Sequence, residues 1–217
     1  MEQKTYTLGQ RYIGAGQSEG TIILNEVPGN ALGAYLDGAN IIVNCSAQDA
    51  TGDTMNAGEI TIHGSTGDAA GYAMRGGAIY VQGDAGYRAG IHMKEYKEKV
   101  PVLVIGGRTG SFLGEYQAGG IIVVLGIGSE DRQSVGNFCG TGMHGGRIYL
   151  RTAHLPKDLP EQVVAHKATE EDMQIAAPLI QNYAEKFGAD AESLLHDEYY
   201  VLRPNTQNPY KQLYVTN

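Results

Sequence analysis

A short apolar segment recurs along the first 150 residues. Its seven copies occupy residues 22–24, 41–43, 60–62, 79–81, 102–104, 122–124 and 148–150. The first steps, from 22 to 41, 60 and 79, are 19 residues each. The copies are rich in Ile and Val, which favour strands, and a fixed period of this length indicates a repeat architecture. The pattern therefore predicts one strand per repeat of about 19 residues.

Glycine marks the residues between these strands. Four repeats carry glycines at spacings of four and then five: Gly29, Gly33 and Gly38, then Gly67, Gly71 and Gly76, then Gly110, Gly114 and Gly119, and finally Gly136, Gly140 and Gly145. Two repeats deviate, with Gln48, Gly52 and Ala57 in one and Gly86, Gly90 and Glu95 in the other. Insertions at about 92–101 and 127–134 carry charged residues and are typical of surface loops.

These features predict an all-β fold, a single-stranded right-handed parallel β-helix of about seven coils. Glycine suits corners that need positive φ or a close approach of stacked backbones, and Gly71 and Gly114 are expected to be structural for this reason. The β-helix is predicted for residues 1–152, with a helical and extended segment at 153–217. The first and third residues of each apolar triplet are expected to face the core, including Val102 and Val104.

The middle residue of each triplet is then expected to point outward. These residues are Ile23, Ile42, Thr61, Tyr80, Leu103, Val123 and Tyr149, and nearly all are apolar. A face exposed to water normally carries polar residues, so this one is expected to be covered by the C-terminal segment, by a partner subunit or by a second copy of the chain. A homo-oligomer is accordingly expected for the isolated chain.

The C-terminal segment has a helical pattern. Thr169 is a candidate N-cap before an acidic first turn, apolar residues recur at helical spacing from Met173 to Phe187, and Gly188 is a candidate C-cap. Pro178 is expected to kink or split this helix. A short helix at 191–195 and an extended stretch at 199–202 are predicted next along the chain, with a docking tail that runs to Tyr214.

Composition narrows the classes of function. The net charge of −8 gives no basic footprint, so neither nucleic acid nor an anionic membrane is an expected partner. The two cysteines, Cys45 and Cys139, lie in no CxxC pair, which argues against a disulfide framework or a zinc site. Without a charged and apolar leader or an apolar run of about 18 residues, the chain is expected to be cytoplasmic.

The candidate chemical motifs are weak. Residues 140–145 match GxGxxG, but a strand comes after them where a dinucleotide site needs a helix. Asp53, Asp68 and Asp84 come after strands, yet no pair at a glycosidase separation is evident, and turn carboxylates are the simpler interpretation. His63, His92, His144, His154, His166 and His196 are scattered, and Cys139 has no basic neighbour to activate it. No catalytic, cofactor-binding or metal-binding residue is assigned.

Two segments carry a family resemblance. Residues 114–126, GEYQAGGIIVVLG, and residues 137–146, NFCGTGMHGG, resemble the late coils of the GXGXG domain at the C-terminal end of the glutamate synthase large subunit. The acidic helix after Thr169 and the aromatic tail also resemble the segment on the C-terminal side of that β-helix. The chain has neither the amidotransferase domain nor the flavin-binding barrel of that subunit, and it looks like the stand-alone form of the β-helix.

The resemblance implies a non-catalytic scaffold subunit of a glutamate synthase-type complex. Its partners would be amidotransferase and flavin-binding synthase subunits, and those partners would hold the FMN and the iron–sulfur cluster. An alternative is the C subunit of a formylmethanofuran dehydrogenase-type complex, which has the same repeats. A third hypothesis is an independent β-helix that acts on carbohydrate. The isolated chain is expected to have no activity and no bound cofactor.

Overall fold

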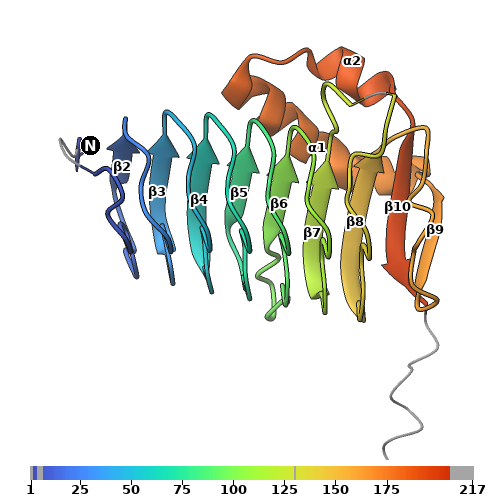
Figure 1. Cartoon of the computed structure of the whole chain (residues 1–217), viewed down its shortest axis with the longest axis horizontal. Helices are drawn as coiled ribbons and strands as arrows, with labels where there is room; N and C mark the ends of the chain where they lie inside the picture. Colours follow the sequence, from blue (N-terminus) through green and yellow to red (C-terminus); the bar gives the residue numbers. More distant parts are fainter. Residues whose placement is uncertain (1, 4–6, 130, 206–217) are drawn as a thin grey trace, which may run out of the picture.

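The computed structural model describes residues 2–3, 7–129 and 131–205, and within these ranges the chain is mostly β (Figure 1). One sheet contains ten strands in the order β1-β2-β3-β4-β5-β6-β7-β8-β10-β9 among these residues. The strands are β1 (Glu2–Gln3), β2 (Thr21–Leu24), β3 (Asp37–Val43), β4 (Ala57–Ile62), β5 (Ala78–Val81), β6 (Val102–Ile105), β7 (Ala118–Val124), β8 (Gly145–Arg151), β9 (Val163–Lys167) and β10 (Tyr199–Pro204). The helices are α1 (Glu170–Phe187) and α2 (Ala191–His196).

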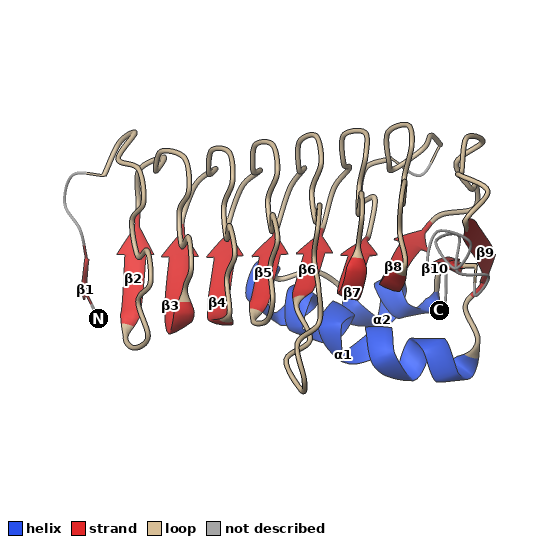
Figure 2. Ribbon diagram, turned by 90° about the horizontal axis from the view of Figure 1, so that it is seen from below, coloured by secondary structure: helices blue, strands red, loops and turns tan. Residues whose placement is uncertain are grey.

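Strands β1–β8, which we call the strand stack, pair in chain order and all in parallel. Long loops join one strand to the next on the same side of the sheet (Figure 2). Ile22, Ile41, Ile60 and Ile79 are successive partners, which confirms the 19-residue period. The loops also stack, because Ala47, Thr66, Ala85 and Thr109 form a second parallel row of bridges. Each repeat therefore contacts the next at its strand and at its loop.

The predicted orientation of β6 is wrong by one residue. Leu103 pairs with Ile79 and Ile122 and is fully buried in the core, whereas Val104 pairs with Tyr80 and Val123 on the outward side. The insertion before β6 makes the step from Ile79 to its partner longer than the regular period, so the period gives no guidance there. All four residues of β6 are apolar, and such a run fits either register.

The glycines have the two predicted roles. Gly71 and Gly114, the middle glycines of their repeats, have φ of 70° and 64°. A Cβ on Gly114 would lie 2.8 Å from Cδ1 of Ile148, whereas one on Gly71 would have no neighbour nearer than 3.7 Å. Gly29 and Gly145 instead lie against backbone carbonyls of the preceding repeat, Gly9 and Ala118, where a Cβ would collide with the oxygen.

The C-terminal segment closes the far end of the stack. β10 pairs antiparallel with β8 and with β9, so the last parallel strand is not left as a free edge. Helix α1 has its N-cap at Thr169 and its C-cap at Gly188, with φ of 68°, as predicted, and Asp172 completes a capping box with Thr169. The helix is not split at Pro178, which is exposed on its outer side. The tail after residue 205 lies outside the described residues.

Within the described part of the chain, no helix has both the length and the apolar character needed to cross a bilayer.

Candidate functional site

Helix α1 covers half of the outward face of the strand stack (Figure 1). We call the outward residues, as the structure has them, the outward row: Ile23, Ile42, Thr61, Tyr80, Val104, Val123 and Tyr149. The last four are buried together with Ala176, Ile180 and Tyr183 of α1 in one hydrophobic cluster. The hydroxyl of Tyr183 donates to the carbonyl of Gln82 at 3.0 Å, and burial raises the pKa of Tyr183 to about 12.

The other end of the outward row is not covered by α1. Ile23 and Ile42 are half-buried, and α1 ends at Phe187, whose ring packs edge-on against His63 at 5.1 Å. Lys186 forms an ion pair of 2.6 Å with Glu59 at this end. A groove of about 290 Å³ lies here, and its lining includes Thr21, Asn40, Ile42, Glu59, Thr61 and Lys186. The outward row thus continues beyond the end of α1 as the half-buried Ile42 and Ile23, with polar groups beside them.

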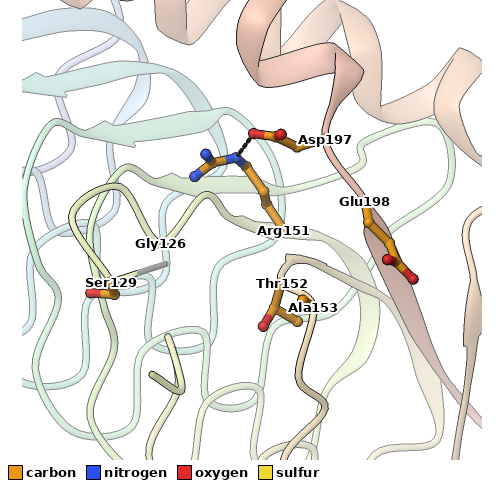
Figure 3. Close-up of a pocket in the computed structure, with 7 residues that line it drawn as sticks. All are labelled: Gly126, Ser129, Arg151, Thr152, Ala153, Asp197 and Glu198. Atoms are coloured by element: carbon orange, nitrogen blue, oxygen red, sulfur yellow. Dashed lines mark hydrogen bonds and ion pairs between the residues drawn. The ribbon is translucent and has the colours of Figure 1, made fainter. Parts of the chain in front are cut away.

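A second pocket, of about 240 Å³, lies between β8 and the start of β10 (Figure 3). Nε of Arg151 contacts Asp197 at 2.6 Å, and its Nη1 donates to the carbonyl of Leu125 at 2.7 Å. Glu198 points away from this pair and forms an ion pair with Lys167 at 2.6 Å, which lowers the pKa of Glu198. The charges are therefore paired with one another, and they tie β10 to its neighbours.

Two of the three carboxylates considered for acid–base chemistry join successive repeats. Oδ1 of Asp68 accepts from the N–H of Tyr87 at 2.8 Å, and Oδ1 of Asp84 accepts from the N–H of Arg108 at 2.6 Å. Asp53 accepts from the hydroxyl of its neighbour Thr54 at 2.7 Å. Because Asp68 and Asp84 use their oxygens on the backbone of the next repeat, the prediction of turn carboxylates fits these contacts.

Asp68→Ala is expected to lower the free energy of unfolding by about 1 kcal/mol, because it leaves the N–H of Tyr87 without this acceptor. Asp53→Ala is expected to cost less than about 0.5 kcal/mol, since its hydroxyl partner reaches water instead. Urea unfolding of the two variants beside the parent measures both values. If Asp68→Ala and the parent have equal urea midpoints, the hydrogen bond from Tyr87 to Asp68 does not stabilise the fold.

The histidines and cysteines are not gathered into a metal site. No group of three His, Cys, Asp or Glu side chains suited to a metal ion occurs among the described residues. His92 stacks on Tyr116 with a centroid distance of 5.2 Å, and His166 contacts Asp172 at 3.1 Å. Cys139 is fully buried, and burial raises its pKa to about 12, which leaves it protonated and unreactive.

The GxGxxG match lies in a loop that leads into β8. Gly140 and Gly142 have φ of 74° and 70° and belong to the repeating corners, and a strand comes after them as expected. The motif does not lead into the helix N-terminus that would hold a pyrophosphate. The motif is thus a product of the glycine repeat.

Two structural features have no counterpart in the sequence predictions. Asp172, which the sequence pattern places in an acidic first turn, is buried and contacts Thr169, His166 and Arg203. Burial raises the pKa of Asp172, yet these hydrogen bonds and the charge of Arg203 outweigh burial, so the pKa lies below its usual value. The spacing of Thr169 and Asp172, which matches a capping box, was the available signal.

The second feature is a row of aromatic rings on the loop side of the repeats. Tyr87, Phe112 and Phe138 contact one another in turn at centroid distances of 5.3 and 4.9 Å. Arg88 lies over the first two rings and pairs with Glu115 at 2.9 Å. The rings come from successive repeats, so the period that predicts the strands could also have predicted this aromatic row.

Parallel strands stacked at a fixed period, with glycines at the turns between them, define a repeat protein. Helix α1 covers half of its apolar outward face. The family model described as the GXGXG motif matches residues 3–206. The chain therefore belongs to the GXGXG motif family, and the resemblance noted in the sequence is confirmed at this level.

Two known proteins are similar to this chain. The uncharacterized protein MJ1350 of Methanocaldococcus jannaschii is 44% identical over 131 residues, which cover 57% of this chain and 50% of that protein. The formyltransferase/hydrolase complex FhcABCD of Methylorubrum extorquens, solved with methylofuran, contains a chain that matches with a TM-score of 0.66 and 26% identity. This match covers 86% of the present chain and 66% of the other. The chain thus spans about half of the first relative and just under two thirds of the second.

Proposed function

We propose that this chain is a non-catalytic scaffold subunit of a multi-subunit oxidoreductase complex. In this proposal residues 1–152 form a right-handed parallel β-helix of about seven coils, and residues 153–217 form an appendage on it. The observation that carries the proposal is the outward row, which α1 covers from Tyr80 to Tyr149 but leaves half-exposed at Ile23 and Ile42. Apolar surface that continues past its own cover is typical of a protein interface.

The first candidate is a glutamate synthase-type complex. The resemblance of residues 114–126 and 137–146, together with that of the C-terminal segment, supports it. Amidotransferase and flavin-binding synthase subunits would perform the glutamine-dependent transfer to 2-oxoglutarate and hold the FMN and the iron–sulfur cluster. The chain itself would hold no cofactor and would work in the cytoplasm.

The second candidate is a complex of the formylmethanofuran dehydrogenase type, with this chain in the place of its C subunit. The observation that favours it is the similarity to a chain of a formyltransferase/hydrolase complex over 86% of the present chain. The two candidates are supported about equally, since the repeats are common to both. An independent carbohydrate-acting β-helix has less support, because Asp68 and Asp84 hydrogen-bond the backbone of neighbouring repeats.

Ile42→Asp is expected to abolish assembly with the partner subunits while the chain itself melts close to the temperature of the parent. Ile42 is half-buried at the uncovered end of the outward row, so a carboxylate there stays hydrated in the free chain but is desolvated in an interface. The measurement is purification of the tagged chain from its own organism, with mass spectrometry of the co-purifying subunits.

Val164→Asp is the matched control, because Val164 is an exposed apolar residue of β9, away from the groove. Co-purification of amidotransferase and flavoprotein subunits with the parent and the control would support the first candidate. Co-purification of formyltransferase or hydrolase subunits would support the second. If Ile42→Asp retains every partner that the parent has, the uncovered end of the outward row is not the interface. A homo-oligomer that persists in Ile42→Asp would likewise place the self-association elsewhere.

A further inference from the structure

A second groove lies on the other flank of α1, at the starting ends of the strands. Its volume is about 530 Å³, and its lining includes Glu95, Val100, Ile121, Arg147, Ile175 and Arg203. These residues come from the insertion before β6, from β7 and β8, from α1 and from β10. The insertion before β6 extends below the strands in Figure 2, and its residues Glu95 and Val100 form one wall of the groove. The volume falls in the range of small-molecule sites.

Two arginines define the polar side of this groove. Arg203 forms an ion pair with the buried Asp172, but its Nε is buried and has no hydrogen-bond acceptor among the described residues. Arg147 has no carboxylate partner within the described ranges, although it lines the groove. A guanidinium carries five donors, so Arg147, which pairs with no carboxylate among the described residues, favours an incoming anion.

The nearby carboxylates are already engaged. Oδ2 of Asp172 accepts from the backbone N–H of Thr169 at 3.1 Å and contacts His166, and Oδ1 holds Arg203. Oε1 of Glu95 accepts from the N–H of Gly120 at 2.8 Å. Arg147 forms an ion pair with neither carboxylate among the described residues, although Glu95 keeps its negative charge in the same groove.

Tyr149 indicates that the two arginines lie close together. Its hydroxyl is buried and lacks a well-aligned hydrogen-bond partner among the described residues. Burial raises the pKa of Tyr149, a hydrogen bond with Arg147 and the charge of Arg147 lower it in part, and the charges of Asp172 and Arg203 act on it in opposite directions. Both guanidinium groups therefore act on the same hydroxyl from the two strands β8 and β10, which are adjacent in the sheet.

Part of the lining is apolar. Val100, Ile121 and Ile175 also line the groove, Ile121 is the strand partner of Arg147, and Val100 and Ile175 are both exposed. A bare inorganic anion would leave these side chains in water, whereas a carboxylate on an apolar body would cover them and pair with Arg147.

We propose that this groove is a binding site for a small organic acid, whose carboxylate pairs with Arg147 beside Arg203, and whose apolar body packs on Val100, Ile121 and Ile175. The site belongs to this chain alone and does not depend on the scaffold role proposed above.

Benzoate is a suitable probe, because it joins one carboxylate to a flat apolar ring. Titration of the full chain, followed by chemical shifts of the backbone amides, is expected to show saturable shifts at residues around Gly120, Gly146 and Arg203. Arg147→Gln is expected to weaken benzoate binding at least about tenfold, since a charged hydrogen bond is lost. Arg147→Lys is expected to restore part of the affinity, because it keeps the charge but not the paired donors.

Lys157→Gln serves as the matched control, since it removes an exposed cation outside the groove and is expected to leave the affinity unchanged. Benzamide, equal in shape but neutral, and phosphate, charged but without an apolar body, are both expected to bind at least about tenfold more weakly.

Val100→Asp tests the apolar wall independently of Arg147 and is expected to weaken benzoate binding by repulsion. The proposal is overturned if benzamide binds as well as benzoate, or if both Arg147→Gln and Val100→Asp bind benzoate like the parent. Because the isolated chain is titrated, this result is separate from partner capture.

Discussion

Gly114→Val is expected to lower the free energy of unfolding by about 2 to 5 kcal/mol. Two costs add at this position. Its φ of 64° lies in the left-handed region, which a β-branched side chain rarely adopts, and its Cβ would lie 2.8 Å from Cδ1 of Ile148. Ile148 is fully buried in the row of stacked isoleucines, so it has no free space into which to move.

A comparison with Gly71 separates the backbone strain expected at Gly114 from the steric contact with Ile148. Its φ of 70° is nearly the same, but a Cβ there would have no neighbour nearer than 3.7 Å. Gly71→Ala is therefore expected to cost about 1 to 2 kcal/mol, from the backbone alone, and Gly114→Ala is expected to cost more. Denaturant unfolding of the two alanine variants and of Gly114→Val measures the difference. If Gly71→Ala and Gly114→Ala unfold at the same midpoint, the contact with Ile148 has no energetic effect.

Leu103→Asp is expected to prevent folding of the chain at ordinary temperature. Leu103 is fully buried between Ile79 and Ile122 in the core of the strand stack, and no cation lines this core to pair with a carboxylate among the described residues. The cost of burying such a group exceeds about 4 kcal/mol, which is a large part of the stability of a typical domain. The expected result is loss of the cooperative thermal transition and of the strand signal in circular dichroism.

Val104→Asp is the neighbouring comparison, because Val104 lies on the outward side of the same strand, under α1. Its carboxylate becomes hydrated if α1 leaves the sheet, so the expected damage is confined to the C-terminal segment. Limited proteolysis is expected to cleave α1 in Val104→Asp faster than in the parent, while the strand signal persists. A soluble, cooperatively folded Leu103→Asp beside an unfolded Val104→Asp would contradict the register of β6.

The repeat itself was readable from the sequence. The 19-residue period, the corner glycines, the capping box at Thr169 and Asp172 and the stop at Gly188 are local signals, because each reports a backbone conformation that only a few residue types adopt. The inward residues were predictable from the alternation of side chains wherever the period was intact. The same reasoning failed at β6, where an insertion breaks the period and Val102 to Ile105 are all apolar.

The sequence by itself therefore determined a stack of glycine-cornered strands, with an apolar outward face and a helix able to cover part of it. Only the tertiary structure decided how far α1 reaches along that face, that Leu103 rather than Val104 is in the core, and that Arg147 and Arg203 line one groove. These two arginines lie far apart in the sequence, and no local pattern links them. The physical reason is that strand order and helix docking depend on the packing of distant segments, whereas turns and caps depend on the residues that form them.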